Sequence, residues 1–202
     1  MSSETLPVQV CFLGDSFVAG IGDETVLGWT GRLAARAAAT GNPVTAYNLG
    51  IRGNTSADIA ARCANEVGSR RSPARQTRVV LSMGVNDTVE LGGAPRVPFE
   101  ESCANLELIL DSFAGDPVLV VGPPAIVDDG QNFQIGRLSA RFDQLCRERG
   151  IPYVDVFPAL EKDPVWRRQV FEGDGAHPRS EGYAALIELV LPAWDRWMGA
   201  TA

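Results

Sequence analysis

The sequence has one histidine, one lysine and few cysteines, and each scarcity limits the chemistry that it can support. His177 is the one imidazole in 202 residues, so any serine–histidine catalysis must use it. The single lysine, Lys162, disfavours a lysine-based mechanism. The four cysteines lie at least 40 residues apart, without the close pairs that metal sites and redox motifs use, and we expect them to be reduced core residues. They are Cys11, Cys63, Cys103 and Cys146.

The sequence also lacks a cluster of positive charge and a long apolar run. Lys and Arg number 18 against 25 Asp and Glu, which gives a net charge of -7, so nucleic acids and anionic membrane surfaces are not expected partners. Residues 1–7 are polar and acidic, unlike a secretory signal, and no apolar run approaches the length that spans a bilayer. We therefore expect a cytoplasmic protein without membrane insertion.

The 45% hydrophobic content is sufficient for one sizeable core, and we expect a single domain over residues 1–202. Apolar, β-rich runs alternate with helical patterns, which predicts an α/β fold with a five-stranded parallel sheet and helices on both faces. The predicted strands are Val8 to Leu13, Thr45 to Asn48, Val79 to Ser82, Val118 to Val121 and Tyr153 to Phe157. The predicted helices are Trp29 to Thr40, Ser56 to Val67, Phe99 to Phe113, Gln131 to Arg149 and Ser180 to Trp197.

Three local patterns refine these expectations. Thr55 and Asp58 match a capping box in its acidic form, which supports a helix that starts just after the glycine of Gly53-Asn54. Pro192 is expected to kink or nearly end the last helix. Residues 128–130, Asp-Asp-Gly, have too few ligands for a calcium loop and are interpreted as a solvated turn.

The residues with chemical potential fall where an open parallel sheet binds its ligands, beyond the carboxyl ends of the strands. Ser16 follows the first predicted strand, Gly53 the second and Asn86 the third. Asp174 and His177 lie in the long connection after the fifth. We therefore expect these five residues to meet at one edge of the sheet.

These residue types are the parts that acyl transfer needs. A serine hydroxyl is a poor nucleophile until a base removes its proton, and imidazole is the usual base, so Ser16 and His177 are the candidate nucleophile and base. Asp174 lies three residues earlier, where a turn can bring its carboxylate to Nδ1 and leave Nε2 free to accept. The backbone amides of Ser16 and Gly53 and the side-chain amide of Asn86 are candidate oxyanion donors.

Each segment alone has a simpler interpretation. Gly-Asp-Ser is a common turn sequence, Asn86-Asp87-Thr88 fits an Asx turn, and Asp174 to Pro178 fits a turn into the last helix. Asp87 is interpreted as a structural neighbour that bonds to loop amides. The combination at the ends of several strands of one sheet favours a catalytic site.

Four segments together resemble the motif blocks of the SGNH/GDSL hydrolases. They are Gly14-Asp15-Ser16-Phe17-Val18-Ala19-Gly20, Asn48-Leu49-Gly50-Ile51-Arg52-Gly53, Gly84-Val85-Asn86-Asp87 and Asp174-Gly175-Ala176-His177-Pro178. The resemblance implies a three-layer flavodoxin-like fold with strand order 2-1-3-4-5, and an esterase, lipase, thioesterase or carbohydrate deacetylase activity on small-molecule esters, without metal or organic cofactor.

The resemblance also implies roles for matching positions. Ser16 is the expected nucleophile, Asp174 and His177 complete the triad, and Gly53 and Asn86 are oxyanion donors. Phe17 stands where many members have leucine, and we expect it to shape the acyl site without altering the chemistry.

Two other functions fit the same sequence. An acyltransferase would use the same triad with an alcohol other than water as acceptor. A non-catalytic flavodoxin-like binding module could hold a phosphate or flavin in the loop from Gly14 to Gly20, but it leaves Asn86, Asp174 and His177 without a purpose.

The sequence says less about the substrate pocket. Three long connections, 85–98, 122–130 and 158–173, are expected to form its walls, with their apolar side chains either lining it or anchoring their own loops. Those side chains are Val89, Leu91, Val97, Ile126, Val127, Trp166, Val170 and Phe171.

Overall fold

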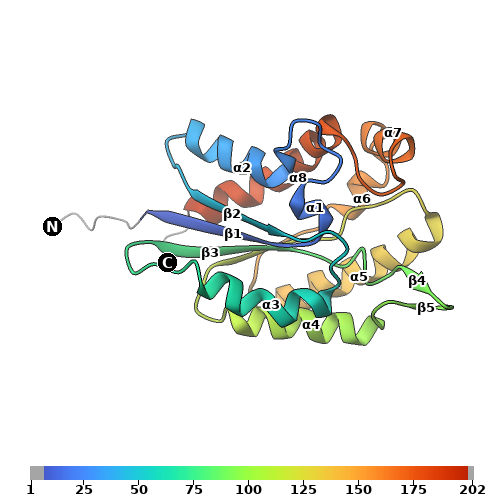
Figure 1. Ribbon diagram of the computed structural model, residues 1–202, viewed down its shortest axis with the longest axis horizontal. Coiled ribbons are helices and arrows are strands. Elements are labelled where there is room, and N and C mark those ends of the chain that lie inside the picture. Colours follow the sequence, from blue (N-terminus) through green and yellow to red (C-terminus); the bar gives the residue numbers. More distant parts are fainter. Residues whose placement is uncertain (1–6, 200–202) are drawn as a thin grey trace.

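The structure is a computed structural model that describes residues 7–199, and a parallel five-stranded sheet forms its centre (Figure 1). The strand order is β2-β1-β3-β6-β7, which confirms the predicted order 2-1-3-4-5 when these five strands are counted along the chain. The strands are β1 (Val8–Gly14), β2 (Thr45–Gly50), β3 (Gln76–Ser82), β6 (Val118–Val121) and β7 (Tyr153–Val154).

Helices cover both faces of the sheet, as predicted (Figure 1). One face carries α1 (Ser16–Ala19), α2 (Gly28–Ala39) and α8 (Ser180–Gly199), with α6 (Phe157–Leu160) and α7 (Pro164–Glu172) beside them. The other face carries α3 (Ser56–Gly68), α4 (Phe99–Ser112) and α5 (Asp129–Glu148). A small antiparallel hairpin of β4 (Glu90–Leu91) and β5 (Ala94–Pro95) follows β3.

The alternation of side chains along β1 divides the core between the two faces. Val10 and Phe12 belong to one apolar cluster, whereas Cys11 and Leu13 belong to the other. Phe12 lies edge-on to Trp29 and stacked on Trp194, with ring centroids 5.9 Å apart in both pairs. A central strand that is apolar on both sides is typical of a parallel sheet with helices on each face.

The chain between residues 7 and 199 follows most of the predicted elements. All four cysteines are buried and unpaired by disulfides. The capping box is present, since Thr55 Oγ1 accepts from the backbone N–H of Asp58 and the Asp58 carboxylate accepts from that of Thr55. None of the helices in this part of the chain combines the length and apolar character that crossing a bilayer requires.

Some boundaries differ from the prediction. The fifth strand covers residues 153–154 instead of 153–157, because Phe157 starts the short helix α6. Residues 128–130 begin α5, with Asp128 as its N-cap, so they are a helix start and not a separate turn. Pro192 lies inside α8, which continues to Gly199; burial of Trp194 and Trp197 beyond the proline compensates for the lost hydrogen bond.

Candidate active site

Asp174 and His177 belong to one tight turn between α7 and α8. Oδ1 of Asp174 accepts the backbone N–H groups of Ala176 and His177 at 3.1 and 2.9 Å, and Oδ2 lies 2.7 Å from Nδ1 of His177. Partial burial opposes ionisation, but the hydrogen bonds from His177 and Ala176 outweigh it and lower the pKa of Asp174 to about 2. An ionised carboxylate only accepts, so the proton of the imidazole lies on Nδ1.

The other ring nitrogen of His177 faces the serine. Nε2 lies 2.8 Å from Oγ of Ser16, and both residues are buried. With the imidazole proton on Nδ1, Nε2 accepts the hydroxyl hydrogen of Ser16. The two side chains come from positions 161 residues apart, so the fold alone brings them together.

Ser16 is placed by the short helix that follows β1. It is the first residue of α1, and the side chain of Asp15 caps that helix by accepting the N–H of Phe17 at 2.9 Å. Gly20 ends the helix with φ 78°, a left-handed conformation that glycine adopts without steric cost. This abrupt strand-to-helix turn fixes Ser16 at the carboxyl end of β1.

Asn86 connects the loops that carry the other candidate donors. Its side-chain Nδ2 donates to Oδ2 of Asp15 at 3.2 Å and to the carbonyl of Asn54 at 3.0 Å. Asp15 precedes Ser16, and Asn54 follows Gly53, so Asn86 links the residues adjacent to both. Burial raises the pKa of Asp15 to about 7, more strongly than its hydrogen bonds lower it.

The backbone amides of Ser16 and Gly53 are unoccupied donors. Within residues 7–199, neither N–H group has a hydrogen-bond acceptor. An N–H at the first position of a helix has no partner in that helix, which explains the Ser16 amide. Gly53 has φ 79°, and a Cβ at this position would meet no atom within 4 Å. The loop therefore uses glycine for its backbone conformation and leaves this amide open to a ligand.

Asp87 has the structural role expected from the sequence. Its Oδ1 accepts the backbone N–H of Ser56 at 2.7 Å, at the start of α3. The carboxylate is buried, and burial raises its pKa. Asp87 thus ties the loop after β3 to the first turn of α3.

Two contacts at the site were not predicted from the sequence. The ring of Phe17 is buried and packs against the imidazole of His177, with centroids 4.8 Å apart, and stacks on Trp166 at 6.3 Å. Nη2 of Arg52 lies 3.6 Å from Oδ2 of Asp174. The buried contact shows that Phe17 packs against the imidazole, whereas its role in shaping the acyl site stays a prediction.

The apolar side chains of the three long connections divide into three groups by burial. Val97, Trp166 and Val170 are buried and anchor their segments, and Trp166 donates its indole N–H to the carbonyl of Ala125 at 2.8 Å. The exposed ones are Leu91, Val127 and Phe171. The two partly buried ones are Val89 and Ile126.

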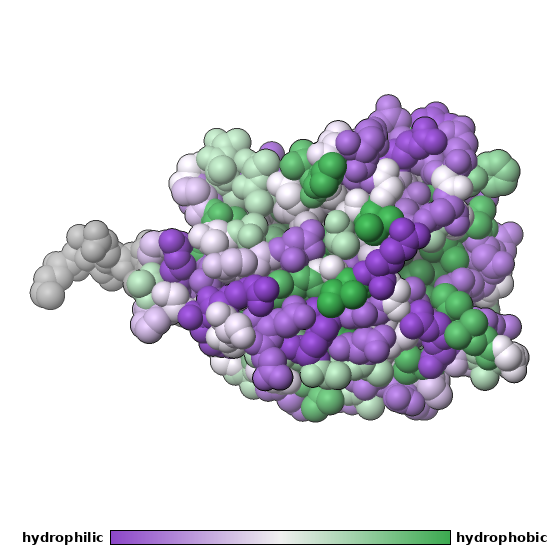
Figure 2. Space-filling view, in the orientation of Figure 1, coloured by the Kyte–Doolittle hydropathy of each residue, from purple (hydrophilic) through white to green (hydrophobic). Residues whose placement is uncertain are grey.

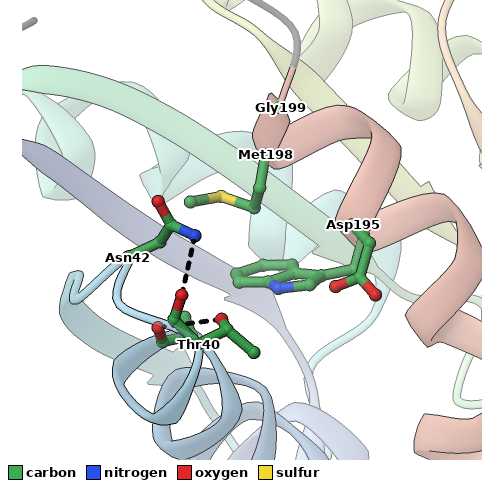
Figure 3. Close-up of a pocket in the computed structure, with 7 residues that line it drawn as sticks. Thr40, Asn42, Asp195, Met198 and Gly199 are labelled. Atoms are coloured by element: carbon green, nitrogen blue, oxygen red, sulfur yellow. Dashed lines mark hydrogen bonds between the residues drawn. The ribbon is translucent and has the colours of Figure 1, made fainter.

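The surface has no single large apolar patch on the face in Figure 2: hydrophilic side chains predominate, and hydrophobic ones form small separate groups. One cavity of about 280 Å³ lies between the C-terminal ends of α2 and α8, lined by Thr40, Asn42, Trp194, Asp195 and others (Figure 3). It contains none of the candidate catalytic residues and lies at the opposite ends of these elements from the site.

A family profile described as "GDSL-like Lipase/Acylhydrolase family" matches residues 12–185 of the sequence. This range includes all five candidate residues. No curated protein matches the sequence.

Solved structures share the fold. The chain is similar to the lipase/acylhydrolase from Enterococcus faecalis, at 24% identity and a TM-score of 0.78, over 96% of this chain and 100% of that one. It is also similar to an acetylxylan esterase from Geobacillus stearothermophilus, at 19% identity and a TM-score of 0.73, over 98% of this chain and 96% of that one. A putative lipolytic protein of the G-D-S-L family from Desulfitobacterium hafniense has 19% identity and a TM-score of 0.72, over 91% and 97% of the two chains.

Identities below 25% show a common fold, whereas the family profile matches the sequence itself over most of its length. The resemblance that the four motif segments indicated is thereby confirmed. The protein belongs to the GDSL-like lipase/acylhydrolase family and is a GDSL-type esterase.

Proposed function

We propose that the protein hydrolyses small or medium-sized carboxylic esters through Ser16, His177 and Asp174. The observation that carries this proposal is the continuous chain of contacts from Oδ2 of Asp174 to Nδ1 of His177 at 2.7 Å, and from Nε2 to Oγ of Ser16 at 2.8 Å. These are the contacts that a serine, a general base and an orienting carboxylate need.

In the proposed reaction, His177 Nε2 takes the hydroxyl proton as Ser16 Oγ attacks the ester carbonyl carbon. The C–O bond to the alcohol then breaks, and the imidazolium returns the proton to the departing alcohol. Water attacks the resulting acyl-serine, again with His177 as base, and releases the carboxylic acid and the free serine. Asp174 stabilises the imidazolium in both halves and keeps the ring oriented.

The open N–H groups of Ser16 and Gly53 are the proposed donors to the oxyanion, with Asn86 as the third. In the structure both hydrogens of Asn86 Nδ2 have acceptors, and the bond to Asp15, at 3.2 Å, is the longer of the two. We infer that Asn86 redirects this N–H to the oxyanion as negative charge develops on the substrate.

The alcohol and acyl parts of the substrate are best approached with a graded series. The fold shared with an acetylxylan esterase supports including acetylated xylo-oligosaccharides beside p-nitrophenyl esters of increasing acyl length. A sharp preference for acetyl would favour a carbohydrate deacetylase, whereas a preference for long chains would favour lipid-like esters.

The decisive experiment replaces the nucleophile. Ser16→Ala should lower kcat for p-nitrophenyl acetate by about a millionfold, because the triad acts as one unit. Ser112→Ala is the matched control: this exposed hydroxyl donates to the carbonyl of Leu108 in its own helix, α4, and its loss should leave kcat unchanged. Thermal unfolding should show that both variants remain folded. Turnover by Ser16→Ala at the wild-type rate would refute the proposed mechanism.

A further inference from the structure

Arg62, on α3, reaches three separate acceptors beneath the candidate active site. Its Nε donates to Oδ1 of Asn54 at 2.8 Å, its Nη2 donates to the carbonyl of Gly14 at 2.8 Å, and its Nη1 donates to Glu66 at 3.0 Å. The side chain is only 16% exposed. Each nitrogen of the guanidinium group is therefore used, in a site largely shielded from water.

Two of these acceptors belong to the segments that carry the proposed catalytic groups. Gly14 is the last residue of β1, two positions before Ser16, and its carbonyl also accepts the N–H of Ile51 at 3.1 Å. Asn54 directly follows Gly53. Arg62 thus connects the end of the nucleophile strand with the loop that carries the open glycine amide.

The connection extends to Asn86 through the main chain of Asn54. While Oδ1 of Asn54 accepts from Arg62, its backbone carbonyl accepts from Nδ2 of Asn86 at 3.0 Å. Arg62 therefore fixes the orientation of Asn54, and the Asn86 amide is bonded to the residue that Arg62 orients. A small displacement of Asn54 moves the acceptor that holds Asn86.

A purely structural ion pair does not explain this arrangement. The Arg62–Glu66 pair has the i,i+4 spacing of an ordinary helix pair, which contributes little to stability and needs only Nη1. Lysine could make that pair as well. Only the planar fork of arginine can also direct fixed N–H donors at Asn54 and Gly14.

We propose that Arg62 is a positioning residue for the ester-hydrolysis reaction: through Asn54 it fixes the position of the Asn86 amide relative to Ser16, which follows β1. The inference rests on the proposed function, because it assumes that Asn86 stabilises the oxyanion. Arg62 does not touch the reacting atoms, so its effect belongs to the chemical step and not to substrate binding.

The first test measures kcat and KM with p-nitrophenyl acetate. Arg62→Met keeps an unbranched apolar stem but loses all three bonds. It should lower kcat by about tenfold to a hundredfold, the cost of a small misplacement of a catalytic group, with KM changed less than about threefold. Glu66→Gln is the matched control, since it weakens the helix ion pair and keeps the bonds to Asn54 and Gly14; its kcat should stay within about twofold of the wild type. An equal loss in Glu66→Gln, or a loss confined to KM, would overturn the proposal.

The second test asks whether Arg62 acts through Asn86. Asn86→Ala alone should lower kcat by about a hundredfold to a thousandfold, as expected for the loss of an oxyanion donor. If Arg62 acts by positioning that amide, adding Arg62→Met to the Asn86→Ala variant should lower kcat by a further factor of less than about three. The same tenfold to hundredfold cost in both backgrounds would assign Arg62 a general structural role and refute the inference.

A folding failure of Arg62→Met and a failure of the proposed function can each be told apart from a failure of the inference. If Arg62→Met does not fold, Arg62→Lys enters the same cycle, because it keeps the positive charge and the pair with Glu66 but loses the fork. If the proposed function itself is wrong, Ser16→Ala or Asn86→Ala will retain wild-type kcat. If only the inference is wrong, those two variants will lose activity while Arg62→Met keeps it or combines with Asn86→Ala multiplicatively.

Discussion

The carboxylate of Asp174 divides its two oxygen atoms between the backbone of its own turn and the imidazole of His177. This part of the site could be predicted from the sequence because it is local. A three-residue separation lets one turn bring the carboxylate to Nδ1, whatever the rest of the fold does.

The contacts that could not be predicted are those between distant segments. Asn86 and Asp15 are 71 residues apart in the sequence, and Phe17 contacts the imidazole of His177 from the other end of the sequence. Both depend on how the ends of β1 and β3 and the turn before α8 pack, which no spacing along the chain specifies. Arg62 was missed for the same reason, since two of its acceptors, Asn54 and Gly14, lie outside its own helix.

One residue in the turn before α2 has an unfavourable backbone conformation. Val26 has φ 60°, which is rare for a β-branched residue, and its side chain is 87% exposed. Hydrogen bonds to Asp23 fix this turn. The carboxylate of Asp23 accepts the N–H groups of Thr25 and Gly28, and the backbone carbonyl of Asp23 accepts the N–H of Val26 at 3.0 Å. The surrounding turn thus maintains the conformation against the preference of valine.

Val26→Gly should therefore stabilise the protein by about 1 kcal/mol, because glycine adopts a positive φ freely and no buried side chain is lost. Urea denaturation followed by tryptophan fluorescence measures the free energy of unfolding. Val127→Gly is the control, since Val127 is an exposed valine without a positive φ, and glycine there should lower stability. A destabilised Val26→Gly variant would show that the turn does not strain residue 26.

At the scale of elements, length decides what the sequence predicts. The long helices α2, α3, α4, α5 and α8 have apolar periodicity over several turns, and their predicted bounds agree closely with the structure. The four-residue helices α1 and α6 are about one turn long, too short to show a period. Helix α7 was missed inside a connection expected to be a loop, although Asp163 and Pro164 mark its start with a cap and a proline.

The β4–β5 hairpin was also missed, and it contributes to the site. Gly92 and Gly93 both have positive φ, as a two-residue hairpin turn requires, and this Gly-Gly pair was a readable signal. Just after β5, Nη2 of Arg96 donates to the carbonyl of Gly53 at 3.0 Å. The hairpin therefore places a second guanidinium on the loop that Arg62 holds from beneath.

The start of α3 fixes the other side of this loop, and its capping box can be tested. Thr55→Ala removes the acceptor for the N–H of Asp58 and should lower the free energy of unfolding by about 1 kcal/mol. Thr40→Ala, at the exposed C-terminal end of α2, is the control and should change stability by less than about 0.5 kcal/mol. Equal losses in the two variants would show that the box adds nothing beyond an ordinary threonine.

Across the whole molecule, carboxylates with lowered and with raised pKa values have opposite effects on stability as the pH changes. Asp23 and Asp174 have pKa values lowered to about 2, so the stability that they contribute is present above about pH 3.8 and is lost as the pH falls through about 2. Asp15 behaves in the opposite way, because burial raises its pKa from 3.8 to about 7. Burial raises the pKa of Asp87 as well.

Between about pH 4 and pH 7 the folded protein retains a proton on Asp15 that the unfolded chain has released, so stability should fall as the pH rises through this window. Asp15→Asn should flatten that slope, leaving the smaller part due to Asp87, because the amide does not titrate. Urea unfolding at a series of pH values from 4 to 8 measures it. Asp23→Asn, which loses the bond to Arg32, should instead lower stability by a similar amount across the window and leave the slope intact. If Asp15→Asn keeps the wild-type slope, the buried carboxyl of Asp15 beside Ser16 does not hold a proton near neutral pH. The Asn86 amide would then donate to an ionised carboxylate throughout the pH range in which an imidazole base works.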